Sequence, residues 1–475
     1  MVVNNNDYNV VRQPYINKYI KVNLLNQNFA VVDEISGQLI NLSISVNADS
    51  DLRRMADISL IVEEGDDSYI IKAGSKIFLN RYCQPYVGYE NITTGEIQWY
   101  NQGIYLINAP SWEYNAANNT LSFNGIDLMS KLTGMRNGNL EGVPAVIPQG
   151  SNVRDAIIAT LALGGFTQYI VDECTLSNGA VQDVPYDIEI PQGGTVYQIL
   201  EALRDIVPNY QIYFDIDGVF HYDKIPSGDN DPVLIDDDLW KDVLIGENVS
   251  TDFENMKNVI EVFGKTHDGV EYYDPHGYLA PGGLLKINCD GLPDDISPYT
   301  LIGATIGEDI DQPSILVMVN DRMNALVVDS HGNPCTHIDG NRYVVFMYQE
   351  DGNWQYLGGI QPYAKIEDNN PDSPFYVEGE AGRIRIVLSG GEYDNISSDE
   401  LALERANAEL YWRCRLNDTV NLVTVPIPWL DVNIIVEHTM HQTKETRKYM
   451  IKTYNVSYGE IGNMSITAIS YYSKE

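Results

Sequence analysis

Apolar and polar residues alternate along the first part of the chain. The clearest run is 40–46, where Ile40, Leu42, Ile44 and Val46 alternate with Asn and Ser residues. A period of two predicts a strand with one buried face and one solvated face. Further short strands, separated by Gly, Asn and Pro, are expected at 58–62, 77–79, 97–100, 104–107 and 120–123. Residues 1–148 are therefore predicted to form an N-terminal β-barrel or sandwich with hairpin links.

Helical spacing replaces the alternation near residue 150. Ser151 is expected to cap a first helix, which Gly164-Gly165 ends. The capping box Thr195-Val196-Tyr197-Gln198 is expected to open a second helix that continues until Pro208. Two short strands with an Asp-Gly turn follow. Residues 149–225 are therefore predicted to be a small α/β insert between β segments.

The β pattern returns after residue 226 and is interrupted by a long segment. A strand is expected at 258–264, but residues 265–382 are rich in Gly, Pro, Asp and Asn and contain only short apolar pieces. We interpret 265–382 as an inserted β-rich module with many loops.

The C-terminal part gives sharper signals. Ser397-Ser398-Asp399-Glu400 is a capping box that is expected to open a helix with Leu403, Ala406 and Leu410 on one face. Strands are expected at 383–388, 419–425, 432–437, 448–458 and 463–470. Residues 226–264 and 383–475 are predicted to form a second β-barrel, so the chain is expected to be mainly β. We find no repeat of fixed period in the sequence.

The charge balance limits the binding partners. The chain of 475 residues has 67 acidic and 30 basic residues, a net charge of −37. Binding to nucleic acid or to an anionic membrane needs clustered Lys and Arg, and no basic run occurs. Acidity on this scale keeps a protein soluble, and it would also repel DNA that passed nearby.

Tyrosine and cysteine usage adds two expectations. The chain has 32 Tyr and only 10 Phe, and amphipathic rings suit half-buried strands and subunit contacts. Its five Cys are scattered and odd in number, which favours free thiols in a reducing cytoplasm. No apolar run approaches the ~20 residues of a membrane span, and the polar N-terminus lacks a signal-peptide core. We expect a protein that folds in the cytoplasm without membrane insertion.

Two clusters contain residues that zinc prefers. His331, Cys335 and His337 form one, and His438 and His441 form the other. Zinc needs three or four ligands. Cys335 and His337 could supply two neighbouring ligands, but a strand would point them the same way and nothing obvious completes the set. On a single strand the side chains of His438 and His441 would face opposite sides. We expect no metal.

Candidate catalytic groups are equally sparse. Asp215-Ile216-Asp217-Gly218 is interpreted as a hairpin turn, because a calcium loop needs a bidentate Glu that is missing here. The sequence contains no Gly-x-Ser-x-Gly elbow, no protease-like context around a Cys and no phosphate-binding glycine loop. We expect no catalytic residue and no cofactor, and predict that the protein is not an enzyme.

Three segments, in this order, resemble the tail hub (baseplate hub) proteins of tailed bacteriophages. The first segment is Gln102-Gly103-Ile104-Tyr105-Leu106-Ile107, followed by the strand 121–128 with its Asp127 step. The second is the helix 195–207, followed by the Asp217-Gly218 hairpin and the strand 258–264. The third is the helix segment 402–410, followed by the strands 421–426 and 449–458 and by Met464-Ser465-Ile466-Thr467. Hubs often have Gly after the position of Pro426, where this chain has Pro428-Trp429-Leu430-Asp431. The 265–382 module has no counterpart in a minimal hub.

The resemblance implies a homotrimer. Each chain would contribute two tail-tube-like β-barrels, and three chains would form a pseudo-sixfold ring. The ring would join a tail tube or distal tail protein to a spike, fibre or tip protein, with the tape measure protein as a further candidate partner. DNA would pass through without specific binding, along an acidic wall. The protein would be assembled in the host cytoplasm and reside in the virion, at the tail tip or baseplate.

Two other functions stay open. The 265–382 module could bind carbohydrate or a receptor, with Trp354, Tyr356 and Tyr363 as a glycan platform, although aromatic residues in strands more often lie in a core or an interface. A tail lysin acting on peptidoglycan is the third alternative.

Overall fold

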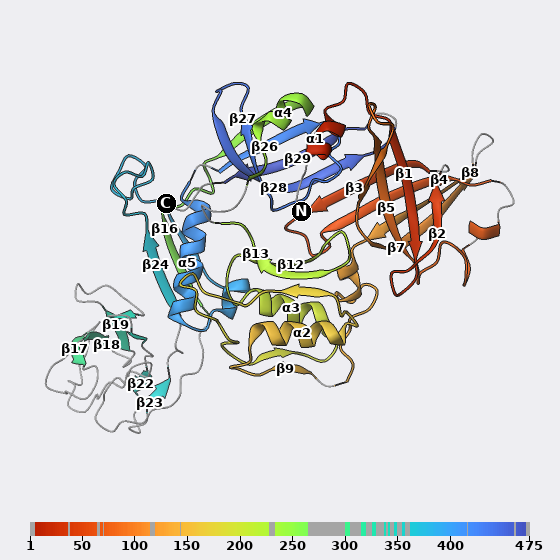
Figure 1. Ribbon diagram of the computed structural model, residues 1–475. Coiled ribbons are helices and arrows are strands. Elements are labelled where there is room, and N and C mark those ends of the chain that lie inside the picture. Colours follow the sequence, from red (N-terminus) through yellow and green to blue (C-terminus); the bar gives the residue numbers. More distant parts are fainter. Residues whose placement is uncertain are drawn as a thin grey trace. The chain divides into compact units, whose positions relative to one another are not determined.

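The computed structural model of the chain contains two compact units (Figure 1). Unit 1 consists of Met1–Arg204, Asn209–Met256 and Leu416–Glu475, and unit 2 of Asp205–Pro208 and Lys257–Arg415. The structure describes residues 5–36, 39–63, 67–69, 71–114, 119–142, 144–227, 233–264, 362–415, 417–459 and 462–471, together with short strands between 300 and 356.

One fourteen-stranded sheet forms the main part of unit 1. Its strands are β1 (Lys18–Leu25), β2 (Val31–Ser36), β3 (Leu39–Asn47), β4 (Arg54–Ile61), β5 (Tyr82–Glu90), β6 (Ile97–Asn101), β7 (Tyr105–Tyr114), β8 (Asn119–Ile126), β14 (Val233–Ile235), β15 (Leu244–Asp252), β26 (Asn417–Thr424), β27 (Ile435–Thr439), β28 (Thr446–Ser457) and β29 (Met464–Ser470). The main path runs β15-β26-β29-β28-β3-β4-β8-β7-β5-β1-β2. The sheet therefore combines strands from the two ends of the sequence.

Eight neighbouring strands of this path form two groups of four. The C-terminal group is β15-β26-β29-β28, and the N-terminal group is β3-β4-β8-β7. In both groups, the strands lie in the order first, second, fourth, third as counted along the chain, and every neighbouring pair is antiparallel. The groups meet where β28 pairs with β3. They are a topological repeat, which no fixed period in the sequence reveals.

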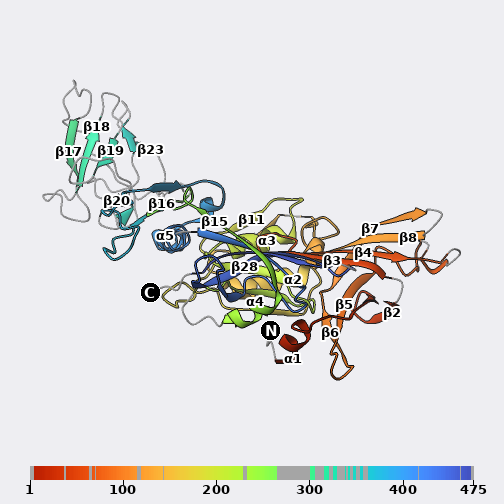
Figure 2. The same ribbon diagram turned by 90° about the horizontal axis from the view of Figure 1, so that it is seen from above.

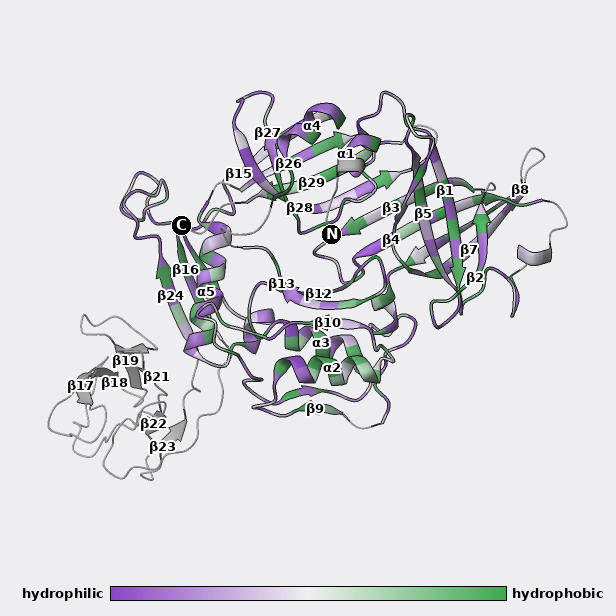
Figure 3. Ribbon diagram, viewed as in Figure 1, coloured by the Kyte–Doolittle hydropathy of each residue, from purple (hydrophilic) through white to green (hydrophobic). Residues whose placement is uncertain are grey.

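A single hydrophobic cluster lies against one face of both groups. It includes Leu42 and Ile58 from the N-terminal group and Val456 and Ile466 from the C-terminal group, all at most 3% exposed. Hydrophilic and hydrophobic residues alternate along these strands (Figure 3). Because the side-chain period is two, a slip of one residue would move the whole buried set to the solvated face.

Two short helices contribute side chains to the hydrophobic cluster of unit 1. They are α1 (Asn5–Val11) and α4 (Asp237–Val243). Val10 and Val11 of α1 and Leu239, Trp240 and Val243 of α4 belong to the hydrophobic cluster. The carboxylate of Asp236 caps α4 by accepting a hydrogen bond from the Leu239 amide.

The α/β insert lies in unit 1 beside the large sheet. Its elements are β9 (Ala145–Ile147), α2 (Val153–Leu163), β10 (Tyr169–Val171), β11 (Ile188–Ile190), α3 (Val196–Arg204), β12 (Tyr210–Phe214) and β13 (Phe220–Lys224). Strands β10, β13 and β12 form one small sheet, β11 and β9 form another, and α2 packs against α3.

The helix ends in the insert differ partly from the sequence-based expectation. Asn152, not Ser151, caps α2 by accepting a hydrogen bond from the Asp155 amide, because the backbone carbonyl of Ser151 is already paired with Val184. The capping box of α3 is confirmed: Gln198 N donates to Thr195 Oγ1 at 3.2 Å and Thr195 N to Gln198 Oε1 at 2.9 Å. However, α3 ends at Arg204, before Pro208.

Unit 2 contains a three-stranded sheet covered by a helix. The sheet has the order β24 (Tyr363–Glu367), β16 (Val259–Phe263), β25 (Arg385–Leu388), and α5 (Asp399–Arg413) packs against β16 and β24 (Figure 2). Ser398 caps α5 as predicted, because Leu401 N donates to its hydroxyl at 3.2 Å. The predicted buried face of α5 is wrong at Leu403, which is 48% exposed. Ala406 is buried as predicted, together with Leu401, Ala402 and Ala408.

Unit 2 also contains short strands in the region of the 265–382 module. They are β17 (Thr300–Ala304), β18 (Ile315–Val319), β19 (Ala325–Val328), β20 (His337–Ile338), β21 (Asn341–Arg342), β22 (Phe346–Tyr348) and β23 (Trp354–Tyr356). They pair as one three-stranded and two two-stranded sheets.

The prediction of a mainly β chain with a small α/β insert is confirmed. Among the described strands the pairing follows an open path, so the two groups form halves of one sheet and neither closes into a barrel. The strand expected at 77–79 is wrong: this segment is bends and turns. Strand β5 was not predicted, because its Tyr, Gln and Pro residues hide the alternation.

Candidate functional site

The eight strands of the two groups carry mostly hydroxyl and amide side chains on the side opposite the hydrophobic cluster. We call this surface the polar face. Its residues, all at least partly exposed, are Gly246, Asn248, Ser250 and Asp252 on β15, Thr419, Asn421 and Val423 on β26, Ser465, Thr467 and Ile469 on β29, Thr453, Asn455 and Ser457 on β28, Asn41, Ser43, Ser45 and Asn47 on β3, Met55, Asp57, Ser59 and Ile61 on β4, Thr120, Ser122 and Asn124 on β8, and Asn108, Ser111 and Glu113 on β7. The register makes this face continuous across the β28–β3 junction.

Many of these polar side chains are hydrogen-bonded to one another across the strands. Across strands, Thr467 pairs with Asn421 at 2.9 Å, Ser59 with Ser122 at 2.8 Å and Ser457 with Asn41 at 3.2 Å, and Asn124 donates to Asp57. Within β3, Asn41 also donates to Ser43 at 3.2 Å. Cross-strand pairs of this kind stabilise a sheet by roughly 0.2–1 kcal/mol each. They also occupy donors that would otherwise be free to bind a ligand.

The polar face carries little charge. Among the positions named above, Asp57, Glu113 and Asp252 are ionisable and none is Lys or Arg. The nearest cation on the same side of β28 is Lys448, which lies beyond the buried Met450 and opposite Glu437. Elsewhere in unit 1 charges are common on exposed strands: on the β1–β2 hairpin, Lys21 lies 3.4 Å from Glu34. The solvated faces of this unit therefore differ in chemistry.

Both ends of the eight-strand run have unpaired strand edges in the described part of the chain. Strand β15 pairs with β26 alone. Strand β7 pairs with β5 only at Tyr105 and Leu106, and beyond that with β8 alone. The register of β7 shifts between Asn108 and Ser111, where Ala109 has a positive φ of 44°. This bulge separates the outer half of β7 from β5.

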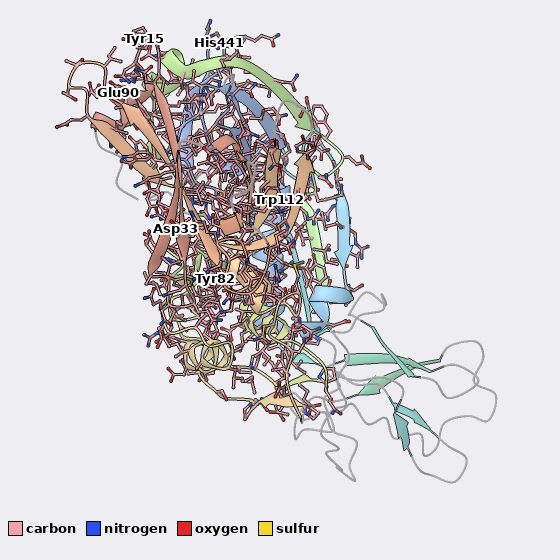
Figure 4. The ribbon with its side chains drawn as sticks, turned by 90° about the vertical axis from the view of Figure 1, so that its right-hand side faces the viewer. Tyr15, Asp33, Tyr82, Glu90, Trp112 and His441 are labelled. Carbon is pink, nitrogen blue, oxygen red and sulfur yellow. The ribbon has the colours of Figure 1, made fainter. Side chains whose placement is uncertain are left out.

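Exposed apolar side chains accompany both edges. On β7, Trp112 is 40% exposed and Tyr114 73% (Figure 4 labels Trp112), although Trp112 lies opposite the fully buried Leu121. On β15, Ile245 is 64% and Val249 37% exposed. Large apolar side chains at unpaired strand edges mark sites where another chain can pair.

An ion pair on the core side joins β4 of the N-terminal group to Asp431, which lies between β26 and β27 and whose side chain is 28% exposed. The guanidinium of Arg54, on β4, is 4% exposed, and its Nη2 lies 2.7 Å from both carboxylate oxygens of Asp431. The carboxylate of Asp127 accepts a hydrogen bond from the Arg54 amide and caps the short 3-10 helix Leu128–Lys131 through Met129. The Asp127 step that belongs to the hub resemblance is thus present, and a short helix follows it.

The segment that departs from the hub pattern supplies Asp431. Within it, Trp429 is 4% exposed and packs against Tyr100, with ring centroids 5.8 Å apart. The carbonyl of Pro428 accepts a hydrogen bond from Gln102 at 2.9 Å. A glycine would provide neither the packing nor the ion pair, so the departure has a structural role.

The β12–β13 hairpin joins the insert to this buried cluster. The guanidinium of Arg53 lies 3.9 Å from the ring centroid of Tyr213 and donates to Gln211 at 3.1 Å. The hairpin contacts the segment 429–434 directly, because Asn433 donates to Gln211 at 2.7 Å. A cavity of about 400 Å³ lies beside this contact, and Arg53, Tyr213 and Trp429 help to line it. Its mixed polar and apolar lining suits ordered water.

The predicted Asp215–Gly218 turn is confirmed. Gly218 has a φ of +77°, a conformation that favours glycine. Asp215 accepts hydrogen bonds from the amides of Asp217 and Val219, both at 2.9 Å. His221 lies 3.0 Å from Asp215 and 3.6 Å from Asp223. Burial alone would lower the pKa of His221, but these two carboxylates raise it to about 9.

The raised pKa of His221 predicts a pH dependence of stability. In the unfolded chain the pKa is about 6.5. The stabilisation from the charged imidazole is therefore complete below that value and is lost as the pH rises through about 9. Between pH 7 and pH 10 we expect wild type to lose about 1–3 kcal/mol more than His221→Asn, as measured by urea unfolding. Equal losses would contradict this origin.

His438 and His441 contact the same carboxylate, contrary to the expectation that they face opposite sides. Glu247 Oε2 lies 2.8 Å from His438 Nε2 and 3.4 Å from His441 Nδ1. His441 lies beyond the end of β27, so strand alternation does not apply to it. In the described part of the chain no group of three or more His, Cys, Asp or Glu is arranged to hold a metal. His331 and Cys335 lie outside the described residues, as does the side chain of His337.

The thiols of the described residues are poor nucleophiles. Cys83, Cys174 and Cys414 are free. Burial raises the pKa of Cys83 to about 12, and burial with a hydrogen bond to Asp368 raises that of Cys414 to about 12. A thiol with so high a pKa carries almost no thiolate at neutral pH.

The glycan platform falls mostly outside the described side chains. Trp354 and Tyr356 lie on β23, and their side chains are not among those described. Tyr363, on β24, packs against Phe263 with the rings tilted by 44° and their centroids 4.7 Å apart, and its amide donates to Asp399 at 3.1 Å. The platform stays a prediction. Among the described helices, none has the length and apolar character needed to cross a membrane.

Comparisons with known proteins identify the fold. A domain family of unknown function, DUF5048, matches residues 372–474, less than half of the chain. No curated protein sequence matches. The 43 kDa tail protein of prophage MuSo2 from Shewanella oneidensis matches with a TM-score of 0.51 and 10% identity, over 95% of this chain and 98% of that one. A tail protein from Neisseria meningitidis MC58 matches with a TM-score of 0.50 and 10% identity, over 95% and 97%.

The chain thus has the fold of phage and prophage tail proteins. The resemblance to tail hubs drawn from the sequence is confirmed at this level. At 10% identity the similarity describes the fold, and the roles of individual residues rest on the geometry given above.

Proposed function

We propose that this chain is a structural hub of a bacteriophage tail. Three copies form a pseudo-sixfold ring that joins the tail tube or a distal tail protein to a spike, fibre or tip protein, and DNA passes through it. The tape measure protein is a further candidate partner. The protein is assembled in the host cytoplasm, resides at the tail tip or baseplate of the virion, and has no enzymatic role.

The topological repeat carries the proposal. Each chain has two four-stranded groups with the same strand order, so three chains supply six similar groups. Within the chain, the groups join where the third strand of one, β28, pairs with the first strand of the other, β3. The corresponding strands whose outer edges are unpaired, for β7 beyond Leu106, are β7 and β15. A contact between β7 of one copy and β15 of the next repeats the internal junction and closes the ring.

The strand directions and the apolar residues fit this contact. Because all eight strands alternate in direction, β7 of one copy runs antiparallel to β15 of the next in a closed ring. At the internal junction, Tyr454 and Val456 lie opposite Val46 and Ile44 and are buried. Trp112 and Tyr114 would meet Ile245 and Val249 in the same way, which removes four exposed apolar side chains from water.

The domain division predicted from the sequence belongs to the same proposal. Residues 1–148 contribute the N-terminal group. Residues 226–264 with 383–475 contribute the C-terminal group. Residues 149–225 are the α/β insert, and 265–382 are an additional module whose task does not affect ring closure.

The mass of the purified chain tests the ring. We expect a trimer, alone or with the tail-tube partner, by native mass spectrometry. The double variant Trp112→Ser/Tyr114→Ser should shift the trimer midpoint to at least about tenfold higher protein concentration, because interface aromatics contribute more than about 1.4 kcal/mol together.

Tyr15→Ser provides the control. Tyr15 is 61% exposed and lies away from Trp112 (Figure 4), so this variant should assemble like wild type. A chain that stays monomeric even with its partner would contradict the hub, and equal assembly of all three proteins would contradict the β7–β15 contact.

A further inference from the structure

The polar face lies on the eight strands that would line the proposed ring, and its chemistry is unusual for a solvated sheet. Exposed strands normally mix Lys, Glu and Asp with small polar residues, as on β1 and β2, where Lys21 pairs with Glu34 and Lys76 with Asp33. Across eight strands of the polar face, the charged residues are Asp57, Glu113 and Asp252.

This surface lacks the groups that hold duplex DNA. Most of the affinity of proteins for DNA comes from Lys and Arg at phosphates, and neither residue occurs at a position of the polar face as defined above. Ser, Thr and Asn can also donate to phosphates. Here, several of these donors are occupied by neighbours on the same face, as between Thr467 and Asn421 and between Ser59 and Ser122.

The acidity of the chain does not explain the low charge of the polar face. The chain has a net charge of −37, so a wall that acted by repulsion alone could have been lined with carboxylates. The polar face instead differs from the acidic wall expected from the composition, with three carboxylates beside twenty hydroxyl, amide and glycine positions.

We propose that the polar face is a non-adhesive, nearly neutral wall for double-stranded DNA in passage. It keeps a water layer through its hydroxyl and amide groups and offers the phosphates neither a cation nor many free donors. This inference rests on the proposed ring, because a polar face on an isolated chain has no DNA to conduct.

New lysines on the face test the inference. Ser45 on β3 and Ser465 on β29 are exposed, lie two strands apart and have no side-chain hydrogen bond that the variants would break within the described residues. In a trimer, Ser45→Lys/Ser465→Lys adds six cations to the wall. We expect wild type to show no binding of a short duplex at ~150 mM salt in fluorescence anisotropy. The variant should bind, with a log–log salt slope of up to about −5.

A matched control separates wall chemistry from total charge. Gln27→Lys/Gln192→Lys adds the same charge at exposed positions off the face, and we expect its DNA binding to be at least tenfold weaker than that of the face variant. Duplex binding by the wild-type trimer, or equal binding by the two variants, would overturn the inference and leave the ring intact. A chain that never forms a trimer would instead overturn the proposed function.

Discussion

Asp431→Ala is expected to lower the free energy of unfolding by about 3–5 kcal/mol, because it leaves a buried guanidinium without its counter-charge. Arg54 is 4% exposed, and both of its short contacts to a carboxylate are to Asp431. Burial alone would raise the pKa of Asp431, but Arg54 and Arg53 hold it below its usual value. The stabilisation from this pair is therefore present above about pH 4 and is lost as the pH falls through the lowered pKa.

Urea unfolding followed by tryptophan fluorescence measures the effect, because Trp429 lies two residues from the change. Asp238→Ala is the matched control: its partner Lys241 lies at 3.0 Å, but the two side chains are 76% and 61% exposed. Such surface pairs contribute about 0–1 kcal/mol. Removal of both buried charges in Arg54→Met/Asp431→Leu should recover part of the loss. Similar losses for Asp431→Ala and Asp238→Ala would show that the Arg54–Asp431 pair contributes no more to stability than an exposed surface pair.

Local sequence patterns predicted those features of the fold that depend on a few neighbouring residues. The run 40–46 became the centre of β3, because strand alternation is a property of a few consecutive residues. The caps of α3 at Thr195 and of α5 at Ser398 could be predicted as well, because a cap involves residues only three positions apart. Propensity failed at β5, whose Tyr, Pro and Gly residues pack by tertiary contacts.

Long-range pairing could not be predicted. The β28–β3 junction joins residues about 400 positions apart, and Arg54 and Asp431 are separated by 377 positions. Alternation predicts that a strand such as β3 has a solvated face. It does not predict which other strands lie beside it and extend that face. The polar face therefore emerges only from the register of eight strands. The repeat of the two groups is hidden for the same reason, because many sequences satisfy the same alternation.

Gly138→Ala is expected to destabilise unit 1 by about 2–5 kcal/mol, the sum of backbone strain and overpacking. Gly138 has a φ of +96°, and a Cβ there would lie 2.5 Å from the Cα and the carbonyl oxygen of Leu132. Backbone atoms cannot move aside as a flexible side chain can. The same turn holds the start of α3, because Val196 N donates to the Gly138 carbonyl at 2.8 Å and Tyr197 N to the Leu132 carbonyl at 3.0 Å.

Gly142→Ala separates the two causes. Gly142 also has a positive φ, +88°, but nothing lies within 4 Å of a Cβ at this position, so strain alone should cost about 1–2 kcal/mol. Urea unfolding of both variants gives the difference, and hydrogen exchange should show faster exchange at the first amides of α3 in Gly138→Ala. Equal losses of unfolding free energy in the two variants would mean that the backbone at Leu132 shifts to accommodate the added Cβ. The start of α3 would then depend on the capping box of Thr195 and Gln198 rather than on this turn.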